Sequence, residues 1–132
     1  MATPTPNTMA KRRMFNTSLI ESDSFCSLTP SAQSLYLHLV MNADDDGFVD
    51  MWKSVLRYMS IRRGHLDTLV DAGYVILFDD DLLLISDWLV HNKIRLDRYS
   101  ESRYKNRLDT LLIHPNGRYF KPSETFLAPQ VK

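Results

Sequence analysis

Residues 51–85 have the sequence MWKSVLRYMSIRRGHLDTLVDAGYVILFDDDLLLI. Apolar residues recur at the spacing of one helix face over 51–59 and again over 66–70, so this stretch predicts two neighbouring helices. Ser60 or a residue beside it can cap the start of the second helix. Gly73 stands where a left-handed residue commonly ends a helix, which predicts that the second helix stops there.

Two apolar runs follow the second helix and predict a β-hairpin. Tyr74–Phe78 and Leu82–Ile85 are rich in β-branched, aromatic and other large apolar residues, and Asp79–Asp81 between them has the composition of a turn. A helix pair followed directly by a hairpin is the layout of a winged helix-turn-helix, in which the second helix of the pair enters the major groove of DNA. The same layout also occurs in small α+β domains without this function.

Two further helices are expected outside this stretch. Thr29-Pro30 is a helix start, because Thr can cap free N–H groups and Pro has no N–H to lose at the first helical position. The apolar residues between Ala32 and Val40 then share one helix face, and those between Tyr104 and Leu112 predict a C-terminal helix. The expected fold is therefore α+β and mainly α: three helices and a hairpin wing, with an extra C-terminal helix.

Length and composition indicate one folded domain. The chain has 132 residues, of which 44% are hydrophobic and 24% charged, as in an average soluble protein. We expect residues 1–13 to be a disordered leader with a basic arm, residues 14–113 to be the winged-helix domain including the basic C-terminal helix, and residues 114–132 to be an irregular tail. Apolar residues of this tail could pair protomers: Phe120, Phe126, Leu127 and Val131.

The charges are segregated along the chain although they cancel overall. Residues 1–13 carry +3, residues 14–52 carry −6, residues 53–63 carry +4, residues 64–90 carry −6 and residues 91–132 carry +5. Blocks of one sign favour a folded molecule with one basic face and one acidic face.

The basic blocks supply the candidate DNA contacts. Arg62, Arg63 and His65 fall at the start of the second helix of the pair, where a groove-inserted helix contacts base edges, and Arg can bond guanine with two hydrogen bonds. The other basic residues are suited to phosphates. The expected phosphate contacts are Lys11, Arg12, Arg13, Lys53, Arg57, Lys93, Arg95, Arg98, Arg103, Lys105 and Arg107.

The sequence offers no signal for catalysis, a metal or a membrane. Cys26 and the four histidines stand at no spacing typical of a metal site or a catalytic triad, and every glycine is isolated. The acidic turn at 42–50 departs from a calcium loop, because Lys53 takes the place of the bidentate Glu. No apolar run approaches the roughly 18 residues of a membrane-spanning helix. We expect no enzyme, no cofactor and no metal, and a cytoplasmic location.

Four blocks of sequence resemble a known family. The blocks AKRRMF (10–15), LTPSAQSLY (28–36), ADDDGFV (43–49) and WLVHNKIRLDRY (88–99) are similar to the N-terminal domain of phage replication initiators, the DnaD-like replisome organisers. After the last block, residues 100–102 depart from the Pro-Thr usually found there. The resemblance implies a winged-helix domain that binds double-stranded origin DNA, self-associates and helps to bring the replicative helicase or its loader to the origin. Members of this family typically carry a further C-terminal region for contacts with single-stranded DNA or the helicase, so single-stranded DNA is a second expected partner.

Two alternatives remain open at the level of sequence. A phage transcriptional regulator would bind a promoter rather than an origin. A protein-interaction module would bind a host protein through acidic surfaces at Asp44–Asp46 and Asp79–Asp81. The second alternative is supported by the zero net charge and by the acidic hairpin tip, which phosphate would repel.

Overall fold

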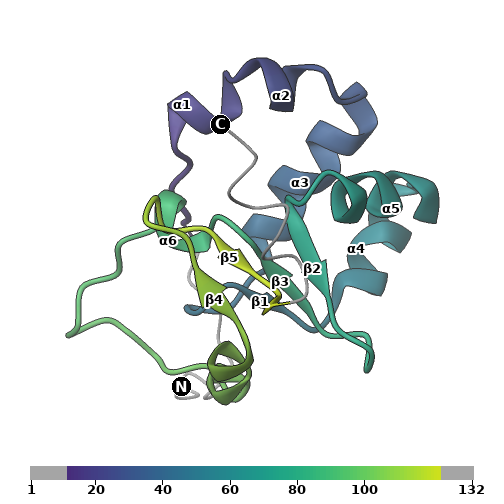
Figure 1. Cartoon of the computed structure of the whole chain (residues 1–132). Helices are drawn as coiled ribbons and strands as arrows, with labels where there is room; N and C mark the ends of the chain where they lie inside the picture. The colour runs from purple at the N-terminus through teal and green to yellow at the C-terminus, as the bar shows by residue number, and fades with distance from the viewer. Residues whose placement is uncertain (1–11, 123–132) are drawn as a thin grey trace.

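The structure is a computed structural model that describes residues 12–122 and has an α+β fold (Figure 1). Lys11 and the tail residues Phe126, Leu127 and Val131 lie outside the described residues. The elements in chain order are α1 (Thr17–Ile20), α2 (Asp23–Cys26), α3 (Pro30–Met41), β1 (Phe48–Val49), α4 (Trp52–Met59), α5 (Arg63–Asp71), β2 (Val75–Leu77), β3 (Leu83–Ile85), α6 (Trp88–His91), the 3₁₀ helix η1 (Lys105–Thr110), β4 (Leu112–Ile113) and β5 (Tyr119–Phe120).

Helix α3 is the centre of the helical core and begins where the sequence predicts. Thr29 Oγ1 accepts a hydrogen bond of 3.1 Å from the backbone N–H of Ala32, and Pro30 takes the first helical position. Its buried face packs against both α4 and α5. The fully buried residues of that face are Ala32, Leu35, Tyr36, Leu39 and Val40.

The predicted helix pair is confirmed as α4 and α5, with one difference at the turn between them. Ser60 does not cap the start of α5; it ends α4 in a left-handed conformation, with φ of 55°. The residue before α5 is Arg62, whose side chain makes no capping hydrogen bond. Gly73 follows α5 with φ of 84°, which is the left-handed stop that the sequence predicts.

The predicted hairpin is confirmed as β2 and β3, and it belongs to a three-stranded antiparallel sheet with the order β1-β3-β2. Ile76 pairs with Leu84 in the hairpin, and Phe48 of β1 pairs with Leu84 from the other side. Strand β1 was not predicted, because its two residues are too few to show an alternating pattern.

The prediction of a C-terminal helix between Tyr104 and Leu112 is wrong. Residues 105–110 form the 3₁₀ helix η1, and Leu112 begins a second hairpin, β4–β5, which turns at Gly117. The beginning of the expected irregular tail is therefore ordered: Tyr119 is buried, and its N–H donates to the carbonyl of Ser86 at 2.9 Å. The spacing of the apolar residues matched a helix, but Leu111 and Tyr104 pack against the outer face of the sheet and do not share a helix face.

Two short helices, α1 and α2, precede the main core, and Phe25 of α2 packs edge-on against Tyr36 and Tyr74. Residues 12–16 lie beside α6, where the N–H groups of Met14 and Asn16 donate to Asn92 and His91.

Between residues 12 and 122, no helix is long and apolar enough to cross a membrane.

Candidate nucleic-acid interface

The start of α4, the start of α5 and the tip of the β2–β3 hairpin meet at Trp52. Its ring is buried, and its Nε1–H donates to the backbone carbonyl of Asp81 in the hairpin tip at 2.6 Å. The Arg63 guanidinium lies 4.9 Å from the centre of this ring, and the Lys53 ammonium lies 5.4 Å from it. Trp52 therefore fixes the hairpin and supports two exposed cations at one place.

The three predicted base-contacting residues gather at the exposed start of α5. Arg62 and Arg63 are exposed and His65 is half-buried. No acidic residue occupies the first turn of α5 and no side chain caps it, so the helix dipole presents positive charge there. One turn further on, Asp67 forms an exposed ion pair of 3.3 Å with Arg63. A Cβ on Gly64 would meet no atom within 4 Å, which leaves room for another molecule to approach the helix backbone.

Two carboxylates of the acidic hairpin tip are paired with basic residues from elsewhere. Asp81 forms an ion pair of 3.0 Å with Lys53, and Asp80 binds the Arg107 guanidinium through two nitrogens. Arg107 lowers the pKa of the Asp80 carboxyl through these hydrogen bonds. The expected repulsion between this tip and phosphate is thereby reduced, and the free protein engages both Lys53 and Arg107 with its own carboxylates.

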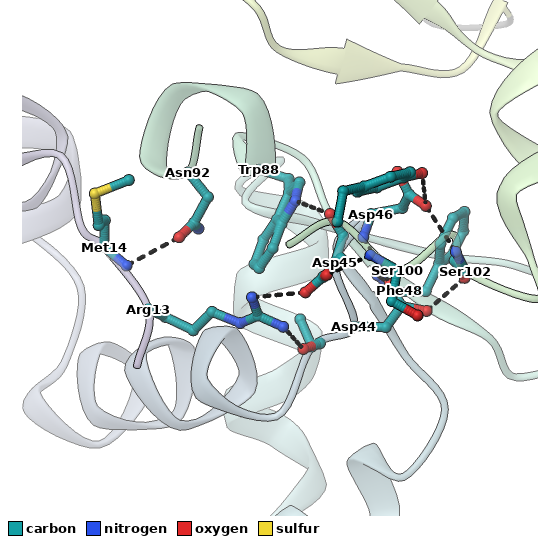
Figure 2. A network of polar contacts seen from close by, with 12 residues as sticks. Arg13, Met14, Asp44, Asp45, Asp46, Phe48, Trp88, Asn92, Ser100 and Ser102 are labelled. Carbon is teal, nitrogen blue, oxygen red and sulfur yellow. Dashed lines mark hydrogen bonds and ion pairs between the residues drawn. The ribbon is translucent and has the colours of Figure 1, made fainter. Parts of the chain in front are cut away.

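The second acidic stretch, Asp44–Asp46, is an internal junction (Figure 2). Asp44 accepts from the N–H groups of Asp46 and Phe48 at 3.0 Å and from the Ser102 hydroxyl, while burial raises the pKa of its carboxyl. Asp46 accepts from the Tyr99 hydroxyl at 2.6 Å. The sequence missed this role, since no local pattern links residues 44–46 to residues more than fifty positions away.

Gly47 brings this junction against Trp88. It has φ of 92°, and a Cβ there would lie 2.6 Å from Cγ of the Trp88 ring, so only glycine fits. The Trp88 Nε1–H donates to the carbonyl of Asp45 at 2.9 Å. The residue before α4 is Met51, whose side chain makes no capping hydrogen bond.

Arg13, predicted as a phosphate contact of an exposed basic arm, is instead paired inside the protein. Its side chain is 4% exposed and forms an ion pair of 3.0 Å with Asp45 (Figure 2). It also donates to the carbonyl of Ala43 at 2.7 Å and lies 5.0 Å from the centre of the Trp88 ring. Arg12 is exposed.

The remaining predicted phosphate contacts are divided between two places. Arg57 is exposed on α4, on the same helix as Lys53. The others lie between α6 and the first residue of η1, in a segment that Figure 1 shows projecting from the body on the side away from α4 and α5. This second group consists of Lys93, Arg95, Arg98, Arg103 and Lys105, all exposed.

Within the second group, local contacts restrain three cations. Arg95 makes two hydrogen bonds to Asp97, of 3.0 and 3.1 Å. The Lys105 ammonium lies 4.9 Å from the centre of the Tyr99 ring, and the Arg103 guanidinium lies 5.9 Å from that of Tyr104. The structure therefore does not form one continuous basic face around α5.

A cavity of about 270 Å³ lies at the other end of α5, between residues 70–73, strand β2 and the β4–β5 hairpin. It is remote along the helix from Arg62. Across residues 12–122, no three His, Cys, Asp or Glu side chains are placed to hold a metal ion together.

Comparison with known proteins finds no matching family model, no matching curated protein and no matching solved structure.

Proposed function

We propose that the protein binds double-stranded DNA as a winged helix, with α5 as the recognition helix and the β2–β3 hairpin as the wing. The order α3-β1-α4-α5-β2-β3 supports this proposal, because it places a helix pair directly before a hairpin whose sheet is completed by β1. In such domains the start of the second helix of the pair meets the base edges.

The observation that carries the proposal is the gathering of Arg62, Arg63 and His65 at the exposed, uncapped start of α5. Arg63 is held against Trp52, beside the hairpin tip. An arginine held in this way loses little conformational freedom when it bonds guanine, and the helix start itself favours an anion.

The resemblance to phage replication initiators makes a replication origin the expected DNA target, reached in the cytoplasm of a host bacterium. The helicase or its loader would then be a later partner of the DNA-bound protein. An acidic surface for a host protein is less well supported, because the Asp44–Asp46 carboxylates are engaged within the protein. At the hairpin tip, Asp80 and Asp81 are paired as well.

Fluorescence anisotropy over a salt series tests the proposal. The full chain is titrated with random duplex, random single strand and duplex fragments of its source genome, and the fragment bound most tightly serves as the cognate site. Arg62→Ala and Arg63→Ala are each expected to cost roughly 1 to 3 kcal/mol on the cognate duplex and little on random duplex, because base contacts read sequence and phosphate contacts do not.

The outcomes separate the parts of the proposal. Equal losses on cognate and random duplex would remove α5 as the recognition helix. The absence of duplex binding at low salt would remove DNA binding altogether. A preferred fragment that lies at a promoter instead of an origin would indicate a transcriptional regulator.

A further inference from the structure

The segment between α6 and η1 carries the most exposed of the large hydrophobic side chains in the described chain. Leu96 is 91% exposed, whereas the next such residue, Met51, is 60% exposed. The neighbouring apolar residue Ile94 packs against the main core. Leu96 is therefore directed outward from an otherwise attached segment.

This projecting turn, residues 93–98, is held at both ends. On one side, Asn92 is buried and accepts from the N–H of Met14 at 2.9 Å. On the other side, Tyr99 donates to Asp46, and the N–H of Ser100 donates to Asp45 at 2.9 Å. Within the turn, the N–H of Arg98 donates to the carbonyl of Arg95 at 2.9 Å. The exposure of Leu96 is thus imposed by structured backbone.

Three cations lie within three residues of the exposed leucine in the chain. Lys93, Arg95 and Arg98 belong to the same turn, and its single acid, Asp97, is paired with Arg95. A turn with an apolar tip and flanking cations is complementary to a surface that has anionic groups on its outside and apolar groups beneath them. Duplex DNA is such a surface, since minor-groove proteins bind phosphates with Lys and Arg and insert Leu, Ile or Met side chains between base steps.

We propose that residues 93–98 form a second DNA-contacting element, in which Lys93 and Arg98 bind phosphates and Leu96 enters the minor groove. This element projects on the side of the molecule away from α5 (Figure 1), so it takes a DNA segment other than the one that α5 contacts. One chain then bridges two duplex segments. The inference rests on the proposed duplex binding through α5.

A capture experiment with the full chain tests this inference. A biotinylated cognate duplex is immobilised, the protein is bound, and retention of a second, fluorescent random duplex is measured. The variant with Lys93→Ala and Arg98→Ala is expected to retain about tenfold less of the second duplex, because two phosphate contacts are lost, while its affinity for the first duplex changes by less than about twofold.

A second variant tests the apolar tip. Leu96→Ala is expected to lower retention of the second duplex roughly threefold or more, because the inserted side chain is lost. Leu112→Ala is the matched control: it removes another exposed leucine, from β4, and is expected to leave retention unchanged. Near-ultraviolet circular dichroism of both variants checks that their folds are intact.

The outcomes distinguish failure of this inference from failure of the proposed function. If the immobilised duplex does not hold the protein, duplex binding itself is wrong. If the first duplex binds normally but no second duplex is retained, the inference is wrong. The inference is also wrong if the variant with Lys93→Ala and Arg98→Ala retains as much of the second duplex as the natural chain does. That result would indicate that two paired copies of the chain bridge the duplexes. The projecting turn would then be available to bind an acidic protein.

Discussion

Arg12 and Arg13 are adjacent and have the same charge, but their side chains lie in different environments. Arg12 is exposed, whereas Arg13 is buried between Asp45 and the Trp88 ring. The sequence predicts the same role for Arg12 and Arg13, as parts of a basic arm. The difference arises from residues more than thirty positions along the chain, which no local pattern reveals.

This difference gives a prediction for a matched pair of variants. Arg13→Ala is expected to lower the free energy of unfolding by about 3 to 5 kcal/mol, because it leaves the Asp45 carboxylate without its buried partner. Arg12→Ala is expected to change it by less than about 0.5 kcal/mol, as is usual at exposed positions. Urea denaturation followed by tryptophan fluorescence measures both. Equal effects of the two substitutions would contradict the buried position of Arg13.

At the scale of the elements, the hairpin tip is the place where the free protein uses carboxylates to hold two basic side chains. Asp80 and Asp81 pair with Arg107 and Lys53, and all four side chains are at least one-third exposed. Exposed ion pairs of this kind contribute at most about 1 kcal/mol each. Phosphate can therefore compete with the carboxylates for the same cations.

Removing these carboxylates is expected to strengthen DNA binding. The variant with Asp80→Asn and Asp81→Asn should bind random duplex roughly threefold to tenfold more tightly at about 0.1 M salt, since it frees Lys53 and Arg107 and removes two negative charges. Anisotropy measures the change. The matched control replaces Glu21 and Asp23 of the α1–α2 region by Gln and Asn, and should bind as the natural chain does. Unchanged binding by the hairpin variant would place the tip outside the DNA interface.

The elements that the sequence predicts are those with a pattern long enough to be seen. Helices α3, α4 and α5 each have a buried apolar face at helical spacing, and the β2–β3 hairpin has an acidic turn between two apolar runs. The C-terminal region has apolar residues at helical spacing but forms no α-helix there, because Leu111 and Tyr119 are buried against the outer side of the sheet. Its apolar spacing matched a helix only by coincidence.

The candidate site was likewise predictable only where its residues are close together in the sequence. Arg62, Arg63 and His65 come together as predicted, because one helix start carries all three. Trp52 was predicted only as an apolar residue of a helix face; its contacts with Arg63 and Asp81 depend on how three elements meet. The separation of the projecting turn from α5 likewise follows from the fold (Figure 1), since both segments are simply basic in the sequence.

At the scale of the whole molecule, His91 joins three segments. Its Nδ1 accepts from the N–H of Asn16 at 2.8 Å, and its Nε2 lies 2.7 Å from the hydroxyl of Tyr36 in α3. Because Nδ1 accepts a backbone N–H, this nitrogen carries no proton in the fold. Burial lowers the pKa of His91 below its ordinary value of 6.5, and the nearby Asp87 carboxylate opposes that shift only in part.

The free energy of unfolding is therefore expected to depend on pH through His91. Unfolded chains protonate this histidine near pH 6.5, whereas the folded chain resists protonation, so its contribution is complete above pH 6.5 and is lost as pH falls toward the lower folded pKa. Urea denaturation should show that the free energy of unfolding of the natural chain is lower at about pH 5.5 than at about pH 8. The decrease should be smaller for His91→Gln. His65→Gln, at the start of α5, is the control for removal of an imidazole from another part of the fold. An identical pH dependence in His91→Gln would mean that protonation elsewhere weakens the fold and that the attachment of the N-terminal segment tolerates acid.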